Sequence, residues 1–147
     1  MPKLYWEDIR EGTEIPSKKK FISVMEFNRF ASGNDEFYMY HMEPEYAKSL
    51  GFPDVIIMGT LRLAYMSSLV SDWIGVDGDL KKIACQHRGM DVRNSTITLG
   101  GKVTRKYQAQ GEHLADCELW VTNEKGERTC PGTATVVLPS KSSGRAA

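Results

Sequence analysis

The segment over residues 60–74 limits the fold of this chain more than any other feature. Its apolar spacing predicts a long helix that ends at Gly75. Apolar residues occupy much more than one stripe of that helix: Leu61, Leu63, Ala64, Tyr65, Met66, Leu69, Val70, Trp73 and Ile74. A helix that is apolar on nearly all sides must be buried on most of them. The rest of the chain is therefore expected to cover it.

Four strands after this helix are expected to supply that cover. They run roughly over residues 82–92, 96–110, 113–122 and 128–138, and the stretches 96–99 and 133–136 alternate between polar and apolar residues. A hairpin turn at 123–126 ends in glycine. Alternating βαβ units, GxGxxG and a phosphate-binding loop are all missing, so a doubly wound nucleotide fold is not expected. The pattern predicts an α+β fold, with an antiparallel sheet wrapped around the long helix.

The first 58 residues are of mixed type. A short strand is expected at 19–22. Ser23, with Glu26 three residues later, predicts a capping box for a helix over 24–31 that Gly33 stops. Pro44 suits the first turn of another short helix, which ends at Gly51. A polar and aromatic loop joins the two.

The bulk properties exclude several classes of function. The chain has 147 residues, which suits one domain over residues 1–139 followed by a disordered tail over 140–147. Nineteen basic residues balance nineteen acidic ones, so nothing favours nucleic acid or an anionic membrane as a partner. Neither a membrane span nor a signal peptide is evident, and a cytoplasmic location is expected.

The cysteines and the remaining histidines suggest no special chemistry by spacing. Cys85, Cys117 and Cys130 lie far apart, without a CxxC or HxxxH pair. Such spacing predicts neither a disulfide framework nor a metal site, and no cofactor is expected. His87 and His113 fall in strand patterns and are expected to be structural or exposed.

The loop over residues 35–41 concentrates groups that can move protons. It contains Asp35, Glu36 and His41 within seven residues. A carboxylate and an imidazole that face one water can take a proton from it and deliver a proton elsewhere. Further along, Gly59 stands at the start of the long helix, where free backbone N–H groups can stabilise a developing negative charge.

A longer pattern surrounds this loop. Residues 36–47 read EFYMYHMEPEYA, Gly51-Phe52 follows, and residues 55–61 read VIIMGTL. The whole segment over 32–75 resembles the active-site segment of the MaoC-like, (R)-specific enoyl-CoA hydratases, whose pattern is D-x-N-P-x-H-x-D-x-x-x-A, then G-F, then P-I-x-H-G-M and a long helix. The resemblance implies a hot-dog fold and reversible hydration of a trans-2-enoyl-CoA to a 3-hydroxyacyl-CoA.

The resemblance also implies roles for single residues. His41 falls on the motif histidine and Glu36 on the motif aspartate. Gly59 falls on the glycine whose amide is assigned to the oxyanion hole. Ser67, eight residues later, falls on the serine that helps to orient the catalytic pair.

Three departures from the family pattern bear on these roles. The motif aspartate is Glu36 here and Asp35 precedes it, so either carboxylate could be the acid partner. Tyr38-Met39 replaces asparagine-proline, and Met58 replaces the histidine before the motif glycine. Tyr38, Tyr40 and Met58 are expected to line a pocket that is less polar and more crowded than in typical members.

Two other functions remain compatible with the pattern. The chain could be a degenerate partner subunit of a heteromeric hot-dog hydratase, or an acyl-CoA thioesterase in which a carboxylate attacks the thioester or activates water. The resemblance implies a substrate that is an acyl thioester of coenzyme A or of an acyl-carrier protein. Because an open sheet edge commonly pairs in this fold, the resemblance implies a homodimer or a heterodimer with another hot-dog chain.

Overall fold

One antiparallel sheet of five strands, in the order β1-β3-β4-β5-β2, forms the body of the molecule. The structure is a computed structural model and describes residues 3–144. The strands are β1 (Glu14–Ile22), β2 (Asp79–Cys85), β3 (Ser95–Ala109), β4 (Glu112–Thr122) and β5 (Arg128–Val137). The helices are α1 (Val24–Asn34), α2 (Pro44–Ser49) and α3 (Gly59–Ile74), with short 3-10 helices η1 (Trp6–Asp8), η2 (Met39–His41) and η3 (Lys141–Gly144).

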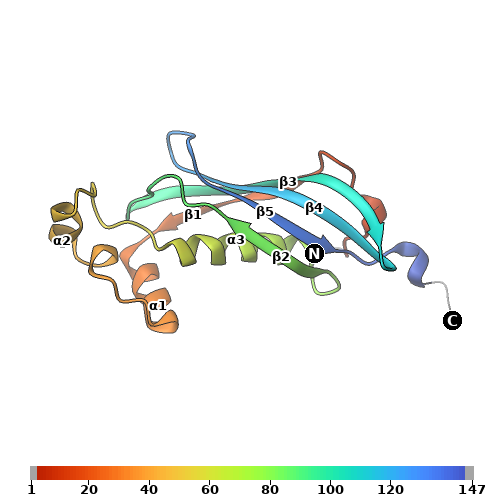
Figure 1. Cartoon of the computed structure of the whole chain (residues 1–147), viewed down its shortest axis with the longest axis horizontal. Coiled ribbons are helices and arrows are strands. Elements are labelled where there is room, and N and C mark those ends of the chain that lie inside the picture. Colours follow the sequence, from red (N-terminus) through yellow and green to blue (C-terminus); the bar gives the residue numbers. More distant parts are fainter. Residues whose placement is uncertain (1–2, 145–147) are drawn as a thin grey trace.

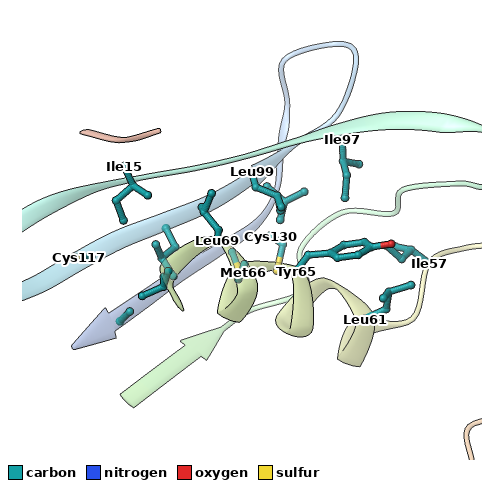
Figure 2. Packing of buried hydrophobic residues seen from close by; sticks show 14 of the residues in the cluster. Ile15, Ile57, Leu61, Tyr65, Met66, Leu69, Ile97, Leu99, Cys117 and Cys130 are labelled. Carbon is teal, nitrogen blue, oxygen red and sulfur yellow. The ribbon is translucent and has the colours of Figure 1, made fainter. Parts of the chain in front are cut away.

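The long helix α3 lies along one face of the sheet, and α1 and α2 lie beyond the same end of it (Figure 1). Met66 and Leu69 of α3 point toward sheet residues such as Leu99 (Figure 2), and all three are almost fully buried. This arrangement is the hot-dog fold that the sequence predicts. The structure differs from the expectation that α3 is buried on most sides. Ala64 is exposed, and the sheet covers the helix from the opposite side only.

The first strand is longer than expected. β1 begins at Glu14 rather than near residue 19, and its pairing with β3 is irregular between Ile15 and Lys18. Pro16 lies at that irregularity and has no N–H to donate to a neighbouring strand. It is tolerated there because β1 is an edge strand.

The helix α1 begins as predicted and ends later. The Ser23 hydroxyl accepts a hydrogen bond from the Glu26 N–H at 3.3 Å, as a helix cap does. Gly33 does not stop the helix, which continues to Asn34. The stop is Asp35, whose φ of 53° is left-handed and whose N–H donates to the Ala31 carbonyl. Aspartate visits that backbone region more readily than most residues.

The segment after β2 also differs from the expectation of a strand over 82–92. β2 ends at Cys85, and the next residues are irregular apart from a single bridge between Val92 and Ile56. Their backbone still contacts β5, since the Arg88 and Gly89 N–H groups both donate to the Thr129 carbonyl. A shared acceptor of this kind does not continue a regular strand ladder.

The beginning of the expected disordered tail is folded. Ser140 is buried and its hydroxyl donates to Glu7, and Lys141–Gly144 forms η3. Residues 145–147 lie outside the described residues, and for them disorder stays a prediction. Within residues 3–144, no helix is both long enough and apolar enough to cross a membrane.

Candidate functional site

Glu36 and His41 meet beside the first turn of α3. Glu36 follows the end of α1, and His41 is the last residue of η2. The Nε2 atom of His41 lies 4.0 Å from Oε1 of Glu36, and the two side chains are 6% and 16% exposed. This separation is too long for a direct hydrogen bond. A single water molecule would be needed to bridge the two atoms by hydrogen bonds.

The imidazole of His41 is held from its other side. Its Nδ1–H donates to the Ile56 carbonyl at 2.8 Å, which leaves Nε2 unprotonated in the neutral ring and facing Glu36. The Tyr40 ring packs against it with ring centroids 4.2 Å apart. Burial lowers the pKa of His41 and the Arg62 charge lowers it further, whereas the Ile56 hydrogen bond and Glu36 oppose that shift. His41 is therefore neutral near pH 7 and able to accept a proton.

The lowered pKa predicts an acid-dependent loss of stability. In the unfolded chain His41 titrates near pH 6.5, so below that pH the unfolded state binds more protons than the native state. The free energy of unfolding should therefore fall as the pH drops from 7.5 to 5.5. Urea unfolding should show a smaller fall for His41→Asn, whose amide can replace the Nδ1–H donor but does not titrate. The contribution of His87 to the pH dependence is the same in the wild type and the variant, because both proteins contain it. Equal pH dependence in the two proteins would contradict the prediction.

The carboxylate of Glu36 is anchored by residues that the sequence analysis missed. Its Oε2 atom accepts a hydrogen bond from the Thr60 hydroxyl and another from the Asn34 amide at 2.9 Å. Both bonds fall on Oε2, so Oε1 remains directed at His41. Asp35 is exposed at the left-handed end of α1, and no hydrogen bond or ion pair joins it to His41 within residues 3–144. Of the two candidate carboxylates, the fold brings Glu36 to the histidine.

Gly59 begins α3 close to this pair. The helix has no side-chain cap at its N-terminus, so the backbone N–H groups of its first turn remain available. The ring of His87 packs on Gly59, and a Cβ atom there would lie 2.7 Å from His87 Nε2. A side chain at position 59 would therefore have to displace the exposed His87 ring.

The other predicted site residues are more scattered. Ser67 donates its hydroxyl back to the Leu63 carbonyl at 2.9 Å and, within the described chain, makes no hydrogen bond to Glu36 or His41. Met58 is fully buried, Tyr40 is half-buried and Tyr38 is exposed. Thr60, rather than Ser67, makes the orienting contact to Glu36. The adjacency of Thr60 to Gly59 was the one sequence signal that could have indicated it.

A buried ion pair lies behind the first turn of α3. Arg62 Nη1 donates to Asp91 Oδ2 at 3.1 Å and to the Gly89 carbonyl at 2.8 Å. The Thr129 hydroxyl also donates to Asp91, at 2.7 Å. Arg62 and Asp91 are 5% and 2% exposed. Together they tie α3 to the irregular segment after β2 and to β5.

His87 and two cysteines form a group of three potential metal ligands. Cys85, His87 and Cys130 place their ligand atoms within 4.8 Å of one another. The sequence analysis missed this group because Cys130 follows His87 by 43 residues, outside any familiar spacing of metal ligands. His113, by contrast, packs its ring against Trp6, in line with a structural role.

Two hollows on the described surface lie away from Glu36 and His41. One of about 450 Å³ lies at the β2–β5 edge and is lined by Cys85, Arg88, Glu118 and their neighbours. The other, of about 270 Å³, lies over β4 and β5. Neither is lined by Glu36 or His41.

Solved structures of an R-hydratase, a MaoC-like dehydratase and a ChsH1-ChsH2 complex share this fold. The R-hydratase PhaJ1 from Pseudomonas aeruginosa superimposes with a TM-score of 0.85 at 16% identity, over 95% of this chain and 88% of that one. The MaoC-like dehydratase from Rhodospirillum rubrum gives 0.80 at 17%, over 94% and 98%. The ChsH1-ChsH2 complex from Mycobacterium tuberculosis gives 0.79 at 19%, over 88% and 98%.

These likenesses confirm the hot-dog fold, in the form that MaoC-like dehydratases and (R)-hydratases have. No protein-family model matches the sequence, and no curated protein matches it.

Proposed function

We propose that this chain catalyses the reversible addition of water to an enoyl thioester, converting a trans-2-enoyl-CoA into a 3-hydroxyacyl-CoA. The observation that carries the proposal is the paired anchoring of Glu36 and His41. Each group has one polar atom held by the protein and one directed toward its partner, with 4.0 Å between the two directed atoms. The likeness to hydratase folds supports the same reaction class.

The gap between the two groups suits one water molecule. A water there can donate one hydrogen bond to Glu36 Oε1 and the other to His41 Nε2. Because His41 is neutral, both groups can act as acceptors, and the pair removes a proton as the hydroxide adds to C3 of the enoyl group. The pair then delivers a proton to C2, which balances the addition of one water.

The thioester oxygen gains negative charge during this addition. The free N–H groups at the start of α3 would stabilise that charge, and Gly59 would let the substrate approach them.

The acyl chain would be bound against a second hot-dog chain. Phe37, Tyr38 and Met39 follow Glu36 directly and are each more than half exposed. Large apolar side chains grouped beside a catalytic pair are suited to cover by a partner. A homodimer would supply that cover from a second copy. A heterodimer is the other arrangement, and a solved neighbour of the same fold is a complex of ChsH1 with ChsH2.

The test is a scan of enoyl-CoA substrates of different chain length and branching. Hydration of each substrate is monitored as the loss of the conjugated enoyl absorbance. We expect the absorbance to fall, with formation of 3-hydroxyacyl-CoA and no free thiol. Release of free coenzyme A would instead identify a thioesterase. Activity that appears only after a second hot-dog chain is added would identify a partner subunit. No turnover in either case would overturn the proposal.

Thr60 provides a test of positioning within the proposed site. Thr60→Val keeps the shape of the side chain and removes the hydroxyl that holds Glu36 Oε2. Only the exposed Asn34 amide then holds the carboxylate, which can turn away from His41 more easily, so kcat should fall by roughly 10- to 100-fold with a smaller change in KM. Thr60→Ser should restore most of the rate. The matched control is Ser67→Ala, for which we expect less than a threefold change, in contrast to the role that the family pattern implies.

A further inference from the structure

The group of Cys85, His87 and Cys130 has the composition of a metal site. Cys85 ends β2, His87 follows two residues later, and Cys130 lies in β5 beside them. The Cys85 Sγ atom lies 3.9 Å from His87 Nε2, and the Cys130 Sγ atom lies 3.6 Å from His87 Nδ1. The mechanism proposed above uses none of the three side chains.

We propose that these three side chains bind one zinc ion, with two thiolates and one imidazole as ligands and a fourth position open to water or another ligand. Bond lengths of about 2.3 Å to sulfur and about 2.0 Å to nitrogen place neighbouring ligands of a tetrahedral zinc roughly 3.5 to 3.8 Å apart. The two sulfur–nitrogen distances of 3.9 and 3.6 Å end on different nitrogens of the His87 ring. With one nitrogen as the ligand, the three ligand atoms lie within 4.8 Å of one another, so they would move closer together around a metal. A rotation of the exposed His87 ring would turn a single nitrogen toward both sulfurs.

The donor set selects the kind of metal. Thiolate and imidazole ligands favour zinc over magnesium or calcium, which take oxygen ligands. Two thiolates also balance the charge of a divalent ion in a place where Cys130 is fully buried. No carboxylate belongs to the group.

The backbone around the three ligands is already fixed. The Gln86 N–H donates to the Pro131 carbonyl at 2.9 Å, and the Arg88 N–H donates to the Thr129 carbonyl at 3.0 Å. These two bonds hold the backbone on both sides of His87 against the strand that bears Cys130. A metal would therefore require movement of side chains rather than of the backbone, and Cys85 lines the 450 Å³ hollow through which an ion could enter.

The test uses cobalt(II) as a coloured substitute for zinc, with the full chain kept reduced by a phosphine. We expect one equivalent of cobalt to produce a sulfur-to-cobalt charge-transfer band and the visible bands of a tetrahedral ion, and zinc to remove both. Cys85→Ala and His87→Ala should each weaken binding roughly tenfold or more. The matched control is Cys117→Ala, because Cys117 is a buried strand cysteine outside the group.

Thermal unfolding provides a second readout, which distinguishes loss of a metal ligand from misfolding of a variant. Zinc should raise the thermal unfolding midpoint of the wild type and of Cys117→Ala, but not that of Cys85→Ala. The proposal is overturned if the reduced wild type gives no charge-transfer band with one equivalent of cobalt. It is also overturned if Cys85→Ala keeps the band. Neither result depends on hydratase activity, so this inference and the proposed function can fail separately.

Discussion

Replacing Glu36 with glutamine is expected to lower the hydration rate by roughly 100- to 10,000-fold without unfolding the protein. The glutamine amide has the size of the carboxylate and can still accept the hydrogen bond from Thr60. It cannot take a proton from water, so only the chemical step should suffer. The measurement is kcat on the best enoyl-CoA substrate, with circular dichroism to confirm the fold.

The matched control is the neighbouring Asp35→Asn. Asparagine tolerates the left-handed backbone of Asp35, whose φ is 53°, and the side chain there is exposed. We expect less than a threefold change in rate. A large loss in Asp35→Asn together with a small loss in Glu36→Gln would assign the acid to Asp35 and contradict the geometry of the site.

Removing the buried carboxylate of Asp91 is expected to reduce the free energy of unfolding by about 3–5 kcal/mol. Asp91→Ala leaves the Arg62 guanidinium buried without its counter-charge and leaves the Thr129 hydroxyl without its acceptor. Chemical denaturation measures the change. The control is Glu45→Ala, which breaks the exposed ion pair with Lys48 and should cost less than about 1 kcal/mol.

The cost should come from the unpaired charge rather than from loss of the pair as such. The double variant Arg62→Met, Asp91→Leu removes both charges and replaces them with apolar side chains. It should therefore be more stable than Asp91→Ala. A double variant less stable than the single one would mean that the guanidinium hydrogen bond to the Gly89 carbonyl matters more than the charge balance.

The sequence predicts the frame of this fold well where local chemistry decides it. The cap at Ser23, the start of α2 at Pro44 and the apolar pattern of α3 each depend on residues close together in the chain. The ends of β1 and β2 depend on which distant strand provides partners, and single-sequence patterns do not contain that information. Gly33 was a misleading stop signal because Asp35, two residues later, adopts the left-handed conformation instead.

In the candidate site, too, residues close together in the chain could be predicted from the sequence and long-range contacts could not. Glu36 and His41 lie five residues apart, so a motif can identify both, and the fold brings them together. Thr60 reaches Glu36 across 24 residues of chain, and the sequence gives no spacing rule for such a contact. The role expected for Ser67 illustrates the limit of carrying a motif over, since its hydroxyl bonds within its own helix.

The short segment 55–57 links the candidate site to the stability of the residues around it. Ile56 provides the acceptor for His41, and this segment belongs to no regular strand. Two backbone hydrogen bonds of 2.9 Å hold this segment in place. The Ile57 N–H donates to the Asp91 carbonyl, and the Arg93 N–H donates to the Val55 carbonyl. Local unfolding of residues 91–93 would therefore release the imidazole as well, so the proposed base and the buried ion pair should open as one cooperative unit.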